Sequence, residues 1–105
     1  MYAVFREASY VPGKPIAESP EFRKFQREHA SRPGYVGSLV ADAGGGRFLT
    51  VTLWETAEAM DAARKALGPV VEQLLNPMMT APSNLIGTGP VVADDLVGSR
   101  ESRGP

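Results

Sequence analysis

Histidine and tryptophan each occur once in this sequence of 105 residues, and both side chains could take part in chemistry. His29 carries the only side chain whose unperturbed pKa lies near neutrality, so it could accept or donate a proton. Trp54 offers a wide ring on which an aromatic ligand could pack. Each residue also has a structural alternative, because a hydrogen-bonded core or interface position would suit His29 and Trp54 equally well.

Five further side chains could complete a site for a small aromatic molecule. Phe25 and Met60 would pack against the ring of the ligand, although ordinary core packing also accounts for them. Tyr35, Arg64 and Asn84 could hydrogen-bond a phenolic oxygen, and each is equally suited to a strand end, a loop or a surface.

The composition excludes several kinds of chemistry. Without cysteine the chain can form no disulfide, thiolate nucleophile, iron-sulfur cluster or cysteine-ligated zinc site, and one histidine rules out every two-histidine metal motif. We therefore expect neither a metal nor a cofactor. A hydrolase triad is disfavoured, since no Gly-x-Ser-x-Gly elbow is present. The formal net charge of −1 gives no long-range attraction to nucleic acid or to an anionic membrane.

The size and the apolar runs predict a single soluble domain. The length is typical of one domain, which we expect to span residues 1–97 and to be followed by a polar, flexible tail over residues 98–105. The apolar stretch Tyr2–Phe5 meets Arg6 and Glu7 at once, so it is too short for a signal peptide. No run approaches the roughly 20 residues that span a bilayer, and a cytoplasmic location is expected.

In the first half of the chain, the pattern predicts a strand over Tyr2–Glu7 and a long loop after it. A helix should begin after Ser19, whose hydroxyl can cap it, with Pro20 at the first helical position. Its apolar stripe contains Phe22, Phe25 and His29, and it should end before Pro33.

In the second half, the pattern predicts two strands, Tyr35–Ala41 and Arg47–Trp54, joined by a glycine-rich hairpin turn over Asp42–Gly46. A second helix, capped by Thr56, should be long and kinked or divided at Gly68–Pro69. A last strand over Leu85–Val92 contains a proline, which favours a sheet edge or a bulge.

The order β-α-β-β-α-β is that of the ferredoxin-like α+β fold, an antiparallel sheet with both helices on one face. In the strand Arg47–Trp54 we expect Leu49 and Leu53 to face the helices, with Phe48 and Trp54 on the opposite face. That second face is also apolar, so it should pack against a second copy and form a homodimer, a dimeric α+β barrel. A twist or bulge beside Trp54 remains an alternative that would place its ring near the helices.

Residues 32–64 resemble the antibiotic-biosynthesis-monooxygenase-like domains of the dimeric α+β barrel superfamily. The similar features are Pro33-Gly34-Tyr35 at the start of a strand, the glycine-rich hairpin, and Val51-Thr52-Leu53-Trp54-Glu55 before the second helix. The resemblance implies a dimeric barrel fold and a cofactor-independent monooxygenase acting on a phenol, hydroquinone or polyketide-like substrate. It also implies that Trp54 lies near the active-site pocket.

Of three other functions, the sequence disfavours haem degradation and RNA binding and leaves one open. The haem-degrading branch of the superfamily has an asparagine on its first strand and a histidine on its second helix, and neither is present here. RNA-binding domains share the element order but expose stacking aromatics in a basic strand pattern, which Arg47–Trp54 lacks. A non-catalytic dimeric barrel that binds a small apolar ligand remains an open alternative.

Overall fold

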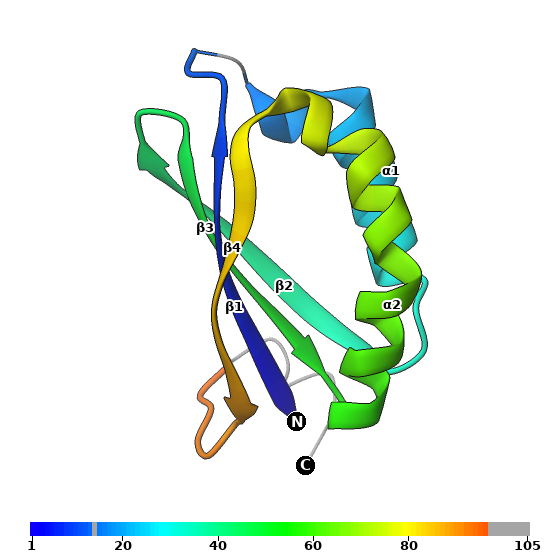
Figure 1. The fold of residues 1–105 in the computed structure, drawn as a ribbon. Coiled ribbons are helices and arrows are strands. Elements are labelled where there is room, and N and C mark those ends of the chain that lie inside the picture. Colours follow the sequence, from blue (N-terminus) through cyan, green and yellow to red (C-terminus); the bar gives the residue numbers. More distant parts are fainter. Residues whose placement is uncertain (14, 97–105) are drawn as a thin grey trace.

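The main elements of the chain follow one another in the predicted order β-α-β-β-α-β (Figure 1). The computed structural model describes residues 1–13 and 15–96. The elements are β1 (Tyr2–Tyr10), α1 (Pro20–Ala30), β2 (Tyr35–Gly44), β3 (Arg47–Trp54), α2 (Ala57–Leu74) and β4 (Met79–Pro90). Short 3-10 turns, Ile16–Glu18 and Asn76–Met78, precede α1 and β4. The predicted tail over residues 98–105 lies outside the described residues.

The strands form one antiparallel sheet in the order β2-β3-β1-β4, and both helices cover the same face of it (Figure 1). This arrangement confirms the predicted ferredoxin-like α+β fold. Among the described residues, no helix combines the length and the apolar character needed to cross a membrane.

Both helices begin where local capping chemistry predicts. The hydroxyl of Ser19 accepts a hydrogen bond from the backbone N–H of Phe22 at 3.1 Å, and the hydroxyl of Thr56 accepts one from Ala59 at 3.0 Å. The helix α2 is not divided at Gly68–Pro69, because it runs unbroken through Pro69. Its buried residues Ala63 and Leu67 lie on the preceding turns, and their packing offsets the loss of one helical hydrogen bond.

The strand β1 is longer than predicted at its C-terminal end, and β4 is longer at its N-terminal end. β1 continues three residues past Glu7, since Tyr10 is buried and packs edge-on against Phe48 at 5.6 Å between ring centroids. β4 begins at Met79 rather than Leu85 and ends at Pro90. It is an edge strand, which tolerates proline because one side of its backbone needs no partner in the sheet.

The predicted orientation of β3 is wrong. Trp54 is only 3% exposed and packs with residues of α2, and Phe48 packs against the buried cluster beside α1, so this face meets the helices. Leu49 alternates with Phe48 and therefore lies on the open face of the sheet, together with the half-exposed Phe5. Both faces of β3 are apolar, so alternation separates the two sets of residues without showing which set the helices cover.

The strand β2 contains a register shift that changes which residues face the helices. Tyr35 pairs with Trp54, whereas the next pair in register is Gly37 with Leu53, so β2 holds an extra residue here. Beyond this bulge, Leu39 pairs with Val51 on the open face and is 67% exposed. Leu39 thus lies on the opposite face from Tyr35.

The core is divided into two clusters of buried side chains. The first, which we call the α1 cluster, joins β1, α1 and the end of α2, and contains Ala8, Tyr10, Ile16, Phe22 and Leu75. The second, the Trp54 cluster, joins β3 to the middle of α2, and contains Trp54, Ala63 and Leu67.

Candidate functional site

The imidazole of His29 lies within a group of three aromatic rings. It stacks on Phe25 with 5.2 Å between centroids, and it lies 5.4 Å from the ring of Tyr35 and 5.5 Å from that of Trp54. Tyr35 and Trp54 also contact each other edge-on at 5.6 Å. The histidine and the tryptophan of the sequence therefore meet, although 25 positions separate them in the chain.

Three elements bring these rings together. Phe25 and His29 are one turn apart on α1, so they share the face of the helix that points to the sheet. Tyr35 starts β2 and pairs directly with Trp54 at the end of β3. The chain reaches Tyr35 through Gly34, whose φ of +81° favours glycine, and a side chain there would collide with Ala59 of α2.

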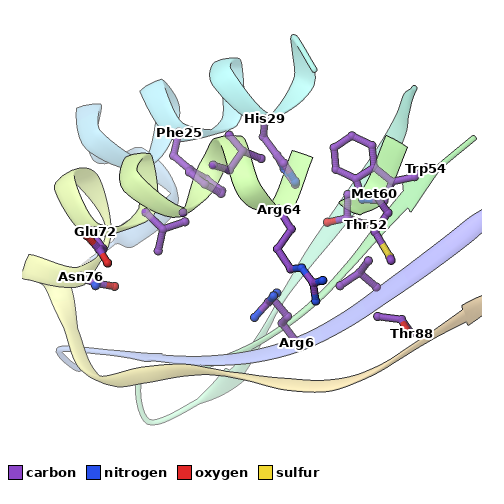
Figure 2. Close-up of a pocket in the computed structure, with 14 residues that line it drawn as sticks. Arg6, Phe25, His29, Thr52, Trp54, Met60, Arg64, Glu72, Asn76 and Thr88 are labelled. Carbon is purple, nitrogen blue, oxygen red and sulfur yellow. The ribbon is translucent and has the colours of Figure 1, made fainter. Parts of the chain in front are cut away.

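A cavity of about 320 Å³ opens beside these rings, between the sheet and the two helices (Figure 2). Its size is at the lower end of the range for small-molecule sites. Its apolar wall consists of Val4, Phe25, Trp54, Met60, Leu67 and Val71. Its polar lining consists of Arg6, His29, Thr52, Arg64, Glu72, Asn76 and Thr88. Such a combination suits an apolar ligand that carries a few polar groups.

Two arginines enter the cavity from opposite sides. The side chain of Arg64 descends from α2 and that of Arg6 rises from β1, so that their guanidinium groups approach each other in the cavity (Figure 2). Arg64 also bonds Asp61 on its own helix, at 3.0 Å. Burial, and secondly the charge of Arg64, lower the pKa of Arg6 below its usual value.

Burial also changes the acid–base character of His29. The loss of solvent around the ring lowers the pKa of His29 to about 4, because the charged imidazolium is poorly hydrated there. Among the described residues the imidazole makes no hydrogen bond, and the far end of the side chain points towards the cavity (Figure 2). At neutral pH, His29 is therefore an uncharged ring that can accept a proton.

The structure gathers most of the predicted site residues. Five of them line the cavity: Phe25, His29, Trp54, Met60 and Arg64. Tyr35 does not line the cavity but contacts His29, and its hydroxyl lies 3.0 Å from that of Ser38. Asn84 is not brought to the cavity, since it pairs in register with Glu7, and Glu7 pairs with Leu49 of the open face.

The sequence reasoning missed Arg6 and the two threonines, Thr52 and Thr88, on the floor of the cavity. A signal for Arg6 was present. In β1, Arg6 alternates in step with Val4 and Ala8, so one charge stands on a face that is otherwise apolar. The threonines gave no such signal, because threonine is common in strands whatever it faces.

No metal site is evident in the part of the chain that the structure describes, where no three histidine, cysteine, aspartate or glutamate side chains gather. The cavity itself offers one histidine and one carboxylate, at Glu72, together with two cationic side chains.

Comparison with solved structures identifies the fold. A protein of unknown function from Nitrosomonas europaea, NE2512, superposes with a TM-score of 0.71 at 14% identity, over 90% of this chain and 92% of that one. An antibiotic biosynthesis monooxygenase gives a TM-score of 0.65 at 17% identity, over 89% and 100%. SnoaB, a cofactor-independent oxygenase from Streptomyces nogalater, gives 0.62 at 16%, over 89% and 98%.

No protein-family model matches the sequence, and no curated protein matches it either. The chain has the fold of the antibiotic biosynthesis monooxygenase-like proteins, which confirms the ferredoxin-like α+β fold of the single chain that the sequence resemblance implied. At these low identities the likeness concerns the fold alone, so the chemistry must be argued from the cavity.

Proposed function

We propose that the protein is a cofactor-independent monooxygenase whose substrate is a small phenol or hydroquinone bound in the cavity between sheet and helices. The observation that carries this proposal is the position of His29, an uncharged base on an aromatic wall with the cation of Arg64 in the same cavity. The fold that the chain shares with SnoaB supports the same reaction class.

The aromatic ring of the substrate would pack against Trp54, Phe25 and Met60, which line one wall. This wall excludes water from the ring and leaves the phenolic oxygen beside the polar side chains. Tyr35 would not touch the substrate, but its contacts with His29 and Trp54 would hold both rings in place.

Proton removal is the first chemical step. His29 accepts the proton of the phenol, and Arg64 stabilises the phenolate. The two acidities are poorly matched, because a phenol has a pKa of about 10 and burial lowers that of His29 to about 4. Arg64 lowers the pKa of the bound phenol, and the phenolate raises that of His29 once it forms, so both charges reduce the mismatch.

The electron-rich phenolate would then reduce oxygen directly. For a hydroquinone, one atom of O₂ enters the ring and the other leaves as water, and the product is a hydroxyquinone. The substrate supplies all four electrons, two through the loss of its two hydroxyl hydrogens as a quinone forms and two through oxidation of one ring carbon. No external reductant is required.

Oxygen uptake provides the test, with a panel of hydroquinones, anthrones and naphthols and with the non-enzymatic rate as baseline. We expect enzyme-dependent uptake that His29→Ala lowers by roughly a hundredfold, the usual effect of removing a positioned base. Trp54→Phe should raise KM more than it lowers kcat, because it reduces the packing surface. ¹⁸O₂ labelling of the product and the absence of hydrogen peroxide separate a monooxygenase from an oxidase.

The weak basicity of His29 favours a second function, the binding of a small apolar ligand without catalysis. In a protein that only binds a small apolar ligand, His29 would need no basicity. That function predicts saturable binding with no oxygen uptake above the baseline for any member of the panel. Uptake that is unchanged in His29→Ala would retain the oxygenase and remove His29 as its base.

We propose further that the protein is a homodimer through the open face of the sheet. This face carries exposed apolar side chains, Phe5, Leu39 and Leu49, on neighbouring strands β1, β2 and β3. An apolar sheet face of this kind is stabilised when another sheet covers it, and a second copy offers a surface of the same shape and chemistry. The cavity lies on the other side of the sheet, beneath the helices.

A further inference from the structure

Arg6 is a charged side chain in a setting that does not neutralise it. It extends from the central strand β1 towards the helices, is half-buried, and forms no ion pair or hydrogen bond with any residue that the structure describes. Its nearest charged neighbour in the cavity is Arg64, which has the same sign. An unpaired cation beside another cation is unfavourable in a partly buried site.

The neighbouring carboxylates do not resolve this imbalance. Glu72 lines the cavity but makes no ion pair with either arginine, and it lies towards the other end beside Asn76 (Figure 2). Asp61 bonds the guanidinium of Arg64 at 3.0 Å, with both side chains more than half exposed, so it offsets part of the charge of Arg64 but forms no ion pair with Arg6. The two arginines and Asp61 together carry one net positive charge, and it is the charge of Arg6 that no described residue pairs with.

We propose that Arg6 and Arg64 together bind a carboxylate group carried on the aromatic ring, so that the ligand of this cavity is a hydroxylated aromatic acid. This inference rests on the proposed function and narrows its substrate class. In an acid with a hydroxyl group beside the carboxylate, Arg64 can contact both the carboxylate and the phenolic oxygen that loses its proton.

A carboxylate suits this site for two reasons. A guanidinium group presents parallel N–H donors that match the two oxygens of a carboxylate, and arginines on two elements fix the direction of the group. The charged end of the ligand would lie beside Arg6, Thr52 and Thr88, and its ring would reach Trp54 and Met60 on the same side of the cavity (Figure 2).

Binding of ligands that oxygen does not attack tests the inference apart from catalysis. We would compare 2-naphthoate with the neutral 2-naphthamide by calorimetry, and use the single indole N–H resonance of Trp54 to verify that both occupy the cavity. The naphthoate should bind at least about tenfold more tightly, as expected for charge-assisted hydrogen bonds. Its affinity should fall with added salt, and that of the amide should not.

Three variants locate the effect. Arg6→Gln and Arg64→Gln should each remove most of the preference for the acid and leave the affinity for the amide within about twofold, whereas Arg6→Lys should retain part of the preference. Arg23→Gln is the matched control, because Arg23 is exposed on α1 and does not line the cavity. Thermal unfolding of each variant verifies the fold.

Equal affinity for acid and amide, no binding of either, or a preference that survives in Arg6→Gln would each overturn the carboxylate site. Oxygen uptake separates this failure from failure of the proposed function. Arginine-dependent binding of naphthoate with no uptake from any hydroxylated acid would retain the site and reject the oxygenase. Uptake that is equal for neutral and carboxylated hydroquinones, and unchanged in Arg6→Gln, would retain the oxygenase and reject the carboxylate site.

Discussion

The imidazole of His29 meets the indole of Trp54 almost edge-on, with 5.5 Å between ring centroids and 69° between ring planes. This contact joins α1 to the end of β3, and it places the one histidine of the chain against the one tryptophan. The fluorescence of the protein therefore originates beside the group that we propose as the base, so changes at His29 can be followed through Trp54.

Acid should destabilise the folded protein through His29. The unfolded chain binds a proton on this residue below about 6.5, whereas burial lowers the pKa of His29 in the folded state to about 4. Between these values the unfolded state holds more protons, so the free energy of unfolding decreases as the pH falls. The decrease is at most about 3 kcal/mol. Urea unfolding of wild type and His29→Phe from pH 7 to 4 measures it, and a pH dependence that is identical in the two proteins would contradict the prediction.

The activity should decrease on the acid side only at low pH. If neutral His29 is the base, kcat/KM should depend on its pKa in the free enzyme and fall near pH 4 rather than near 6.5. Initial rates of oxygen uptake from pH 3.5 to 8, restricted to pH values at which Trp54 fluorescence reports a folded protein, give the profile. A midpoint near 6.5 would show that the ring is well solvated in the working enzyme.

Gly34→Ala should be strongly destabilising. An added methyl group would lie 2.5 Å from Cβ of Ala59, and the backbone φ of +81° is itself unfavourable for alanine. Together these effects should cost about 2 to 4 kcal/mol. Gly45→Ala is the matched control, because Gly45 also has a positive φ but has open space around it. Its cost should be about 1 kcal/mol, and chemical denaturation of both variants measures the difference. Equal costs would exclude the contact with Ala59 as the cause.

Leu39→Asp should dissociate the proposed dimer without unfolding the chain. Leu39 is 67% exposed on the open sheet face, so a charge costs little in the single chain but is severe within an apolar interface. Light scattering at micromolar concentration should give about twice the chain mass for wild type and the mass of one chain for the variant. Gln73→Glu, on the exposed side of α2, should remain dimeric. A wild type with the mass of one chain would end the dimer proposal.

The parts of the fold that depend on local chemistry could be predicted from the sequence. Ser19 and Thr56 cap the helices as expected, and the stripe that contains Phe25 and His29 faces the sheet. The orientation of β3 was predicted wrongly, because both of its faces are apolar and a period of two does not distinguish them. The contacts of Trp54 with α2 and of Phe48 with the α1 cluster decide the orientation, and both contacts are tertiary.

The candidate site was predictable to a similar degree. Residue type pointed to His29 and Arg64, and the family resemblance also placed Trp54 near the pocket; the fold brings all three to one cavity. Arg6 was missed although it is the one charge on its face of β1, because the opposite face also combines an apolar residue, Phe5, with one charge, Glu7. Asn84 was included for its amide group, but the pairing of β4 with β1 places it beside Glu7, away from the helices.

The division of the core into two clusters has a practical consequence. The cavity lies between them, bounded by Phe25 and Val71 beside the α1 cluster and by Trp54 and Leu67 of the other. A molecule that fills the cavity would contact both clusters and join them into one packed core. Occupancy should then raise the melting temperature, since a ligand at about a hundred times its Kd adds about 2.7 kcal/mol to folding. A thermal-shift screen of aromatic acids can therefore find the natural ligand before any reaction is known.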